Sequence, residues 1–213
     1  MQILCVSDWI DPLIYSERLK DRMSDVDIIV SCGDVSLNYL DFIMSMLDKP
    51  LFFVFGNHVS GPNKTEHRPY EAKKSEAPYC FNNLHLKVYK IDNVLITGFQ
   101  GSVWYNGGPY QYRQWEVYLL MLKIIPRLIF NKIFHKRYID IFVAHAAPFG
   151  VGDLPDQCHQ GLKAFNLFIK WFKPKLFLHG HIHLFDRNEK RINYLYDTKI
   201  INCSGFVKTS YEK

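Results

Sequence analysis

Three short apolar runs, separated by segments with helical spacing, constrain the fold of this chain more than any other feature. The runs Gln2–Ser7, Asp27–Cys32 and Leu51–Phe55 predict buried strands, and Pro12–Arg22 and Asn38–Asp48 predict the helices between them. A strand, helix, strand, helix, strand order predicts a parallel sheet with right-handed crossovers. In such sheets, ligands bind beyond the carboxyl ends of the strands.

The remainder of the chain continues this alternation. A polar segment, Ser60–Ala77, predicts a loop that could border a site. No repeat, low-complexity tract or linker is present, which predicts one domain over residues 1–213 with a helical insertion at about 104–138. The further predicted elements are a hairpin of His85–Ile91 and Val94–Gly98, a helical stretch from about Tyr112 to His135, the helix Gly161–Phe172, and the strands Asp140–Ala144, Lys175–His179, Arg191–Tyr196 and Lys199–Asn202.

Side chains that can bind metal ions follow five of the predicted strands. Carboxylate, amide oxygen and imidazole together suit borderline and hard divalent ions such as manganese, iron or zinc. Asp8 and Asp34 could instead cap the following helices, but capping does not explain the amide and histidines at the other strand ends. The residues are Asp8, Asp34, Asn57, His145, His181 and His183.

The order of these residues resembles the signature of the calcineurin-like metallophosphoesterases. The family pattern is DxH, GD, GNH followed by an acidic residue, a lone His, and GHxH. Over residues 8–183, this chain has Asp8, then Gly33-Asp34, Gly56-Asn57-His58, His145 and Gly180-His181-Ile182-His183. The resemblance implies an α/β fold, a four-layer α/β/β/α sandwich of two mixed sheets.

The same resemblance implies a site for one or two divalent ions and hydrolysis of a phosphate ester by a metal-bound hydroxide. Manganese is the expected ion, with iron, zinc or nickel as alternatives. A phosphodiester is slightly favoured, and substrate-binding residues are not indicated. His58 is expected as a catalytic residue near the leaving-group oxygen. One ion would be held by Asp8, Asp34 and His183, and the other by Asp34, Asn57, His145 and His181.

The chain departs from the family pattern in two places. Ile10 stands where the histidine of the first block is expected, and Val59 stands at the acidic position after GNH. Asp11 could replace the missing histidine as a metal ligand, or it could begin a turn before Pro12. The first metal position is therefore less complete than the second.

Two other functions remain open on the sequence. A non-catalytic scaffold of the same fold would account for Ile10, and a nuclease is compatible with the net charge of +5 and the isoelectric point of about 8.8. The sequence has no dense Lys/Arg patch that would indicate nucleic-acid binding. The expected partner is a phosphorylated substrate, and nucleic acid and oligomeric state are left open.

Composition and the N-terminal residues predict a cytoplasmic protein. The five cysteines are odd in number and form no CxxC pair, which favours a reducing compartment with Cys5 and Cys32 as small apolar residues. No leader and no membrane-spanning segment are predicted. His67, His85, His135 and His159 are interpreted as structural or surface residues.

The stretch Trp115–Arg137 combines leucine and isoleucine with lysine and arginine. Such a helix can rest on an anionic membrane, but packing on its own domain with a solvated outer face is the expected arrangement, so peripheral membrane contact is not expected. Aromatic residues precede it and could line a wall against a base or lipid, although core packing is expected. They are Trp104, Tyr105, Tyr110, Tyr112 and Trp115.

Overall fold

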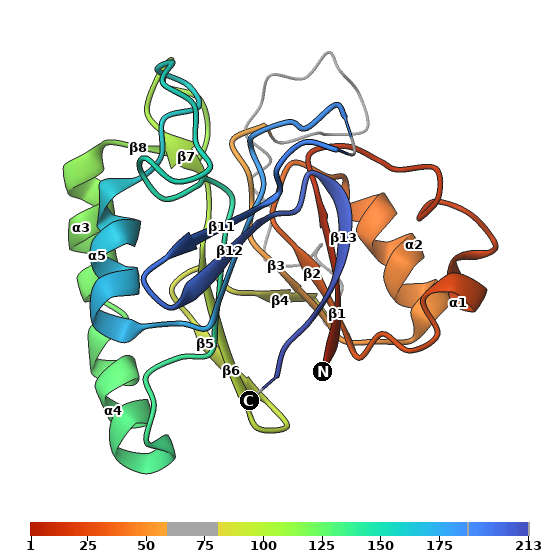
Figure 1. Ribbon diagram of the computed structural model, residues 1–213, viewed down its shortest axis with the longest axis horizontal. Coiled ribbons are helices and arrows are strands. Elements are labelled where there is room, and N and C mark those ends of the chain that lie inside the picture. The colour runs from red at the N-terminus through yellow and green to blue at the C-terminus, as the bar shows by residue number, and fades with distance from the viewer. Residues whose placement is uncertain (59–80, 187, 213) are drawn as a thin grey trace.

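The computed structural model describes residues 1–58, 81–186 and 188–212. Two sheets lie at the centre, and helices cover their outer sides (Figure 1). The first sheet has the strand order β13-β1-β2-β3-β4, and the second has the order β11-β12-β10-β9-β6-β5. The result is the α/β/β/α arrangement that the sequence predicts.

The first sheet contains the three predicted N-terminal strands. β1, β2, β3 and β4 run parallel, and β13 pairs antiparallel with β1 at the edge. The predicted strands are confirmed, whereas β4 and β13 were not predicted. The strands are β1 (Gln2–Ser7), β2 (Ile28–Ser31), β3 (Leu51–Phe53), β4 (Phe81–Asn83) and β13 (Gly205–Ser210).

The second sheet has a parallel centre and antiparallel edges. β6, β9, β10 and β12 run parallel, and β5 and β11 pair antiparallel at the two edges. The predicted hairpin is confirmed as β5–β6. The strands are β5 (Val88–Ile91), β6 (Val94–Phe99), β9 (Ile141–Ala144), β10 (Leu176–His179), β11 (Ile192–Leu195) and β12 (Thr198–Asn202), and a separate short pair is β7 (Ser102–Val103) and β8 (Gln111–Tyr112).

The helices differ from the predicted ones in one place, and one predicted helical stretch is divided in two. The helix predicted over Pro12–Arg22 is wrong for most of its length, because tight turns that start at the Asp11 carbonyl occupy the segment. The stretch from Tyr112 to His135 is two helices, which separate just before Pro126, a residue without a backbone N–H to donate. Its status as an insertion stays a prediction. The helices are α1 (Leu19–Arg22), α2 (Leu37–Leu47), α3 (Gln114–Leu122), α4 (Ile125–His135) and α5 (Lys163–Phe172).

Three apolar clusters hold the four layers together. One packs α1 and α2 on the first sheet, one fills the space between the sheets, and one packs α3, α4 and α5 on the second sheet. In β1, Ile3 and Cys5 face the space between the sheets while Leu4 and Val6 face α2. Both faces of the strand are buried, which explains why it is a continuous apolar run rather than an alternating one.

The cysteines of the described residues are free, and Cys5 and Cys32 lie in the central cluster as predicted. Within the described part of the chain, no helix is long and apolar enough to cross a membrane. The predicted loop Ser60–Ala77 lies outside the described residues.

His85 provides a pH-dependent contribution to stability. Its Nδ1 accepts a hydrogen bond from the Gln100 backbone N–H at 3.3 Å, and burial lowers the pKa of the ring to about 4. The unfolded chain therefore binds a proton that the folded chain does not, and the free energy of unfolding falls as pH drops from about 6.5 toward 4. We predict that His85→Asn, which keeps an acceptor, removes about 2–3 kcal/mol of the stability difference between pH 7.5 and 4.5 in urea titrations. Equal pH dependence of variant and parent would contradict this.

Candidate metal centre

Five of the seven predicted metal ligands gather where the two sheets meet. Asp8 and Asp34 follow β1 and β2 of the first sheet, and His145 and His181 follow β9 and β10 of the second. Asn57 lies in the loop after β3. The side chains of Asp34, His145 and His181 bring one potential ligand atom each within 4.8 Å of one another.

His145 is the centre of this group. Its Nε2 lies 2.9 Å from Asn57 Oδ1 and 3.1 Å from Asp34 Oδ2, and all three side chains are almost fully buried. Its Nδ1 lies 2.8 Å from the Cys32 carbonyl oxygen, which can only accept, so Nδ1 carries a proton. Nε2 is thereby directed at two oxygen atoms, an arrangement in which a cation could replace its proton.

His181 is held in a similar way. Its Nε2 donates to the Cys158 carbonyl oxygen at 2.7 Å, which leaves the lone pair on Nδ1. Burial, together with the charge of His145, lowers the pKa of His181 to about 3. The ring is therefore neutral at pH 7, as a metal ligand must be.

Asp8 carries a buried oxygen atom without a partner. Its Oδ1 accepts hydrogen bonds from the His181 backbone N–H at 2.8 Å and from Ser7 Oγ at 3.1 Å. Its Oδ2 is buried and has no hydrogen-bond partner among the described residues. Burial raises the pKa of Asp8. An unpaired carboxylate oxygen beside this group fits a bound cation, because most buried polar atoms in proteins have a hydrogen-bond partner.

Opposite charges dominate the electrostatics of the group. Burial opposes the charge on His145, but the carboxylates of Asp34 and Asp8 outweigh it and raise the pKa of the imidazole to about 9. Burial also favours the neutral form of Asp34, yet His145 and the His58 backbone N–H hold the pKa of Asp34 below its ordinary value. The charges of the imidazole and of the carboxylates therefore stabilise one another.

Three of the predicted ligands have an uncommon backbone conformation. The φ angles of Asp8, Asp34 and His181 are 70°, 57° and 68°, in the left-handed region. Residues other than glycine occupy this region infrequently, and it is enriched at functional sites. The packing around Asp34 is close, since a Cβ on Gly56 would overlap its carboxylate.

The remaining predicted site residues lie outside this group. The side chain of His58 is exposed, and its backbone N–H donates to Asp34 Oδ1 at 2.8 Å. His183 is exposed and its ring centre lies 6.2 Å from that of Phe185. Asp11 is buried, and its Oδ1 accepts from the Leu13 backbone N–H at 2.8 Å, which forms the turn that the sequence allowed.

Two features near the centre were missed by sequence reasoning. The Asn57 amide Nδ2 donates to Tyr105 Oη at 2.9 Å, which orients the amide so that Oδ1 faces His145. The sequence predicts core packing for Tyr105, because the residue lies in a cluster of aromatic residues and nothing in the sequence connects it with Asn57.

The second missed feature is a loop that contains Asp156, Cys158 and His159, three potential ligands close together. The His159 ring centre lies 5.2 Å from that of His181. No sequence motif indicates this loop, because it contacts the centre through a backbone group, the Cys158 carbonyl oxygen that accepts from His181 Nε2.

The sequence model of the family described as calcineurin-like phosphoesterase matches residues 1–185. The chain belongs to this family. Solved structures agree with the fold of a calcineurin-like phosphoesterase: one shares 17% identity with a TM-score of 0.65, covering 97% of this chain and 94% of its own. The protein TT1561 of Thermus thermophilus shares 17% identity with a TM-score of 0.60, covering 95% of this chain and 88% of its own.

A Vps29 mutant from Entamoeba histolytica is a more distant match, at 12% identity and a TM-score of 0.42, covering 95% of this chain and 73% of its own. At these identities the likeness concerns the fold alone. A comparison with curated proteins found no match.

Asp8 and Asp11 offer a direct test of which aspartate holds a cation. Asp8→Asn removes the charge of a carboxylate whose Oδ2 has no partner among the described residues, so we predict that Mn²⁺ raises the Tm of this variant less than that of the parent. Asp11→Asn should leave the Mn²⁺-dependent rise in Tm unchanged, because its carboxylate serves a turn. Thermal unfolding with and without Mn²⁺ measures both, and an unchanged shift in Asp8→Asn would exclude Asp8 as a ligand.

Proposed function

We propose that this calcineurin-like phosphoesterase is an active enzyme that uses one or two divalent metal ions to hydrolyse a phosphate ester, with a phosphodiester slightly favoured. The observation that carries the proposal is the convergence of Asn57 Oδ1 and Asp34 Oδ2 on His145 Nε2, next to the unpaired Oδ2 of Asp8. A structural hydrogen-bond network has no evident need for a buried, unpaired carboxylate oxygen.

The proposed ligands of the more complete position are Asp34, Asn57, His145 and His181. Asp8, Asp34 and His183 form the less complete position, and Asp34 is shared. When bound, divalent ions lower the pKa of water and neutralise negative charge on a phosphate. The mixed oxygen and nitrogen donors favour manganese, with iron, zinc or nickel as alternatives. Asp11 stays a prediction as a further ligand.

The surrounding residues would orient the ligands. The carbonyl groups of Cys32 and Cys158 accept the second ring N–H of His145 and His181, which holds each imidazole in one tautomer and orientation. Tyr105 would act as a positioning residue, because its hydroxyl holds the Asn57 amide. These contacts support a pre-organised site.

His58 is the proposed acid for the leaving group. Its backbone is anchored on Asp34 Oδ1, so an exposed imidazole is held beside the centre. An exposed proton donor suits a leaving-group alcohol that extends into solvent.

A non-catalytic scaffold is the second candidate. Ile10 occupies the position of the first-block histidine with 45% of its surface exposed, and His183 is exposed and outside the ligand group. Both observations concern the less complete metal position, the one that Asp8, Asp34 and His183 would form. A scaffold would retain metal binding at the more complete position without turnover.

We predict Mn²⁺-dependent hydrolysis of bis-p-nitrophenyl phosphate that collapses in Asn57→Ala. Tyr105→Phe keeps the ring but removes the acceptor for the Asn57 amide, so kcat/KM should fall about tenfold, as for other residues that orient a metal ligand. Asn38→Ala, on the exposed face of α2, is the matched control and should retain the parent rate. Plasmid DNA, as a parallel substrate, tests the nuclease.

The outcome that favours the scaffold is also specific. If Mn²⁺ raises the Tm of the parent but not of Asn57→Ala, and no ester is hydrolysed with manganese, iron, zinc or nickel, then the centre binds metal without catalysis. Hydrolysis that survives Asn57→Ala unchanged would contradict the proposed ligand set.

A further inference from the structure

The outer side of the helical layer on the second sheet is unusually apolar. α3, α4 and α5 form this layer (Figure 1), and nine of the eighteen exposed large hydrophobic residues in the described part of the chain lie in these three helices. A solvated polar outer face was expected from the sequence, and the exposed side chains differ from that expectation. They are Trp115, Tyr118, Leu119, Leu122, Ile129, Phe130, Ile133, Phe134 and Trp171.

The exposed residues follow the helical repeat. In α3, they recur at intervals of three and four residues, which places them along one stripe, while Val117 and Met121 pack inward. In α4, four apolar side chains are between 41% and 63% exposed while Leu128 is fully buried. α3 and α4 therefore each have one apolar face that packs on the core and a second apolar face that is exposed.

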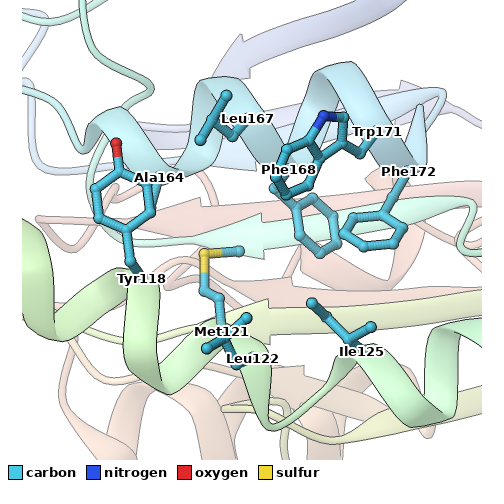
Figure 2. Close-up of a pocket in the computed structure, with 9 residues that line it drawn as sticks. All are labelled: Tyr118, Met121, Leu122, Ile125, Ala164, Leu167, Phe168, Trp171 and Phe172. Carbon is cyan, nitrogen blue, oxygen red and sulfur yellow. The ribbon is translucent and has the colours of Figure 1, made fainter.

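An apolar groove of about 150 Å³ opens between α3 and α5. Figure 2 shows Tyr118, Leu122 and Ile125 on one side of it and Leu167 and Trp171 on the other. The groove is continuous with the exposed stripe of α3, since Tyr118 and Leu122 belong to both. Apolar patches of this kind mark surfaces that bind a partner or a membrane.

The charges around these residues are almost all positive. Residues 113–137 and 163–173 contain nine lysine and arginine residues and a single carboxylate, Glu116. Arg137 pairs with Asp140, whereas no described carboxylate lies within salt-bridge distance of Lys123, Arg127 or Lys132. The Arg127 guanidinium lies 5.0 Å from the Phe130 ring centre, so cation and apolar surface are interleaved.

We propose that this basic-apolar face, formed by α3, α4 and α5, docks the protein on the surface of an anionic lipid bilayer. Exposed tryptophan and aliphatic side chains suit the boundary between headgroups and acyl chains, and uncompensated lysine and arginine suit anionic headgroups. A second copy fits poorly, because an isologous contact would bring two strongly basic faces together. An anionic bilayer offers both apolar acyl chains and negative headgroups, so it matches both the apolar and the basic residues of this face.

Vesicle flotation tests this docking with the intact chain. The parent should float with phosphatidylcholine vesicles that contain phosphatidylserine and not with phosphatidylcholine alone. Leu119→Glu/Phe134→Glu, which places charge in the apolar stripe, and Lys132→Glu/Lys136→Glu, which reverses the rim, should each weaken binding about tenfold or more. Tyr194→Glu, at an exposed position of β11, is the control and should bind like the parent.

Circular dichroism and thermal unfolding of each variant check that it is folded. The substituted residues lie outside the candidate metal centre, so vesicle flotation measures docking independently of any hydrolysis. Three results would overturn the proposal. These are no binding of the parent to phosphatidylserine vesicles, loss of binding only in the lysine variant, or a concentration-dependent dimer without vesicle binding that Leu119→Glu/Phe134→Glu abolishes.

Discussion

The contacts of His145 connect the two halves of the structure. This residue follows β9 of the second sheet, yet its two ring nitrogens reach Cys32, Asp34 and Asn57, all from the loops after β2 and β3 of the first. A buried imidazolium beside carboxylates is favourable only while its partners stay in place, because unpaired buried charges are strongly destabilising. The relative position of the sheets at this edge and the geometry of the centre therefore depend on the same few bonds.

Backbone conformation supplies the second constraint on this edge. Asp8, Asp34 and His181 all occupy the left-handed region, which is unfavourable for residues with a Cβ. Hydrogen bonds offset the cost of this backbone conformation. The Asp8 carboxylate accepts one from the His181 backbone N–H, and the Asp34 carboxylate accepts one from the His58 backbone N–H. Ligand side chains thus hold the turns that present the other ligands, which makes the centre a cooperative unit rather than a set of independent residues.

The candidate metal centre and the basic-apolar face lie on different parts of the molecule. The candidate centre lies at the strand ends where the sheets meet, and the basic-apolar face lies on the outer helical layer (Figure 1). The inner sides of α3 and α5 pack on the same core that supports β9 and β10, the strands that precede His145 and His181.

The sequence by itself determined the three strands β1, β2 and β3, the hairpin β5–β6 and the residue types at the strand ends, because each of these depends on a local run of side chains. Only the tertiary structure decided that β13 pairs with β1, that Asp11 holds a turn and that Tyr105 holds Asn57, since each joins residues that local spacing cannot relate. The unpaired oxygen of Asp8 and the second apolar face of α4 are also tertiary properties. An apolar pattern predicts that a helix has a face to bury, but only packing decides which apolar residues remain outside.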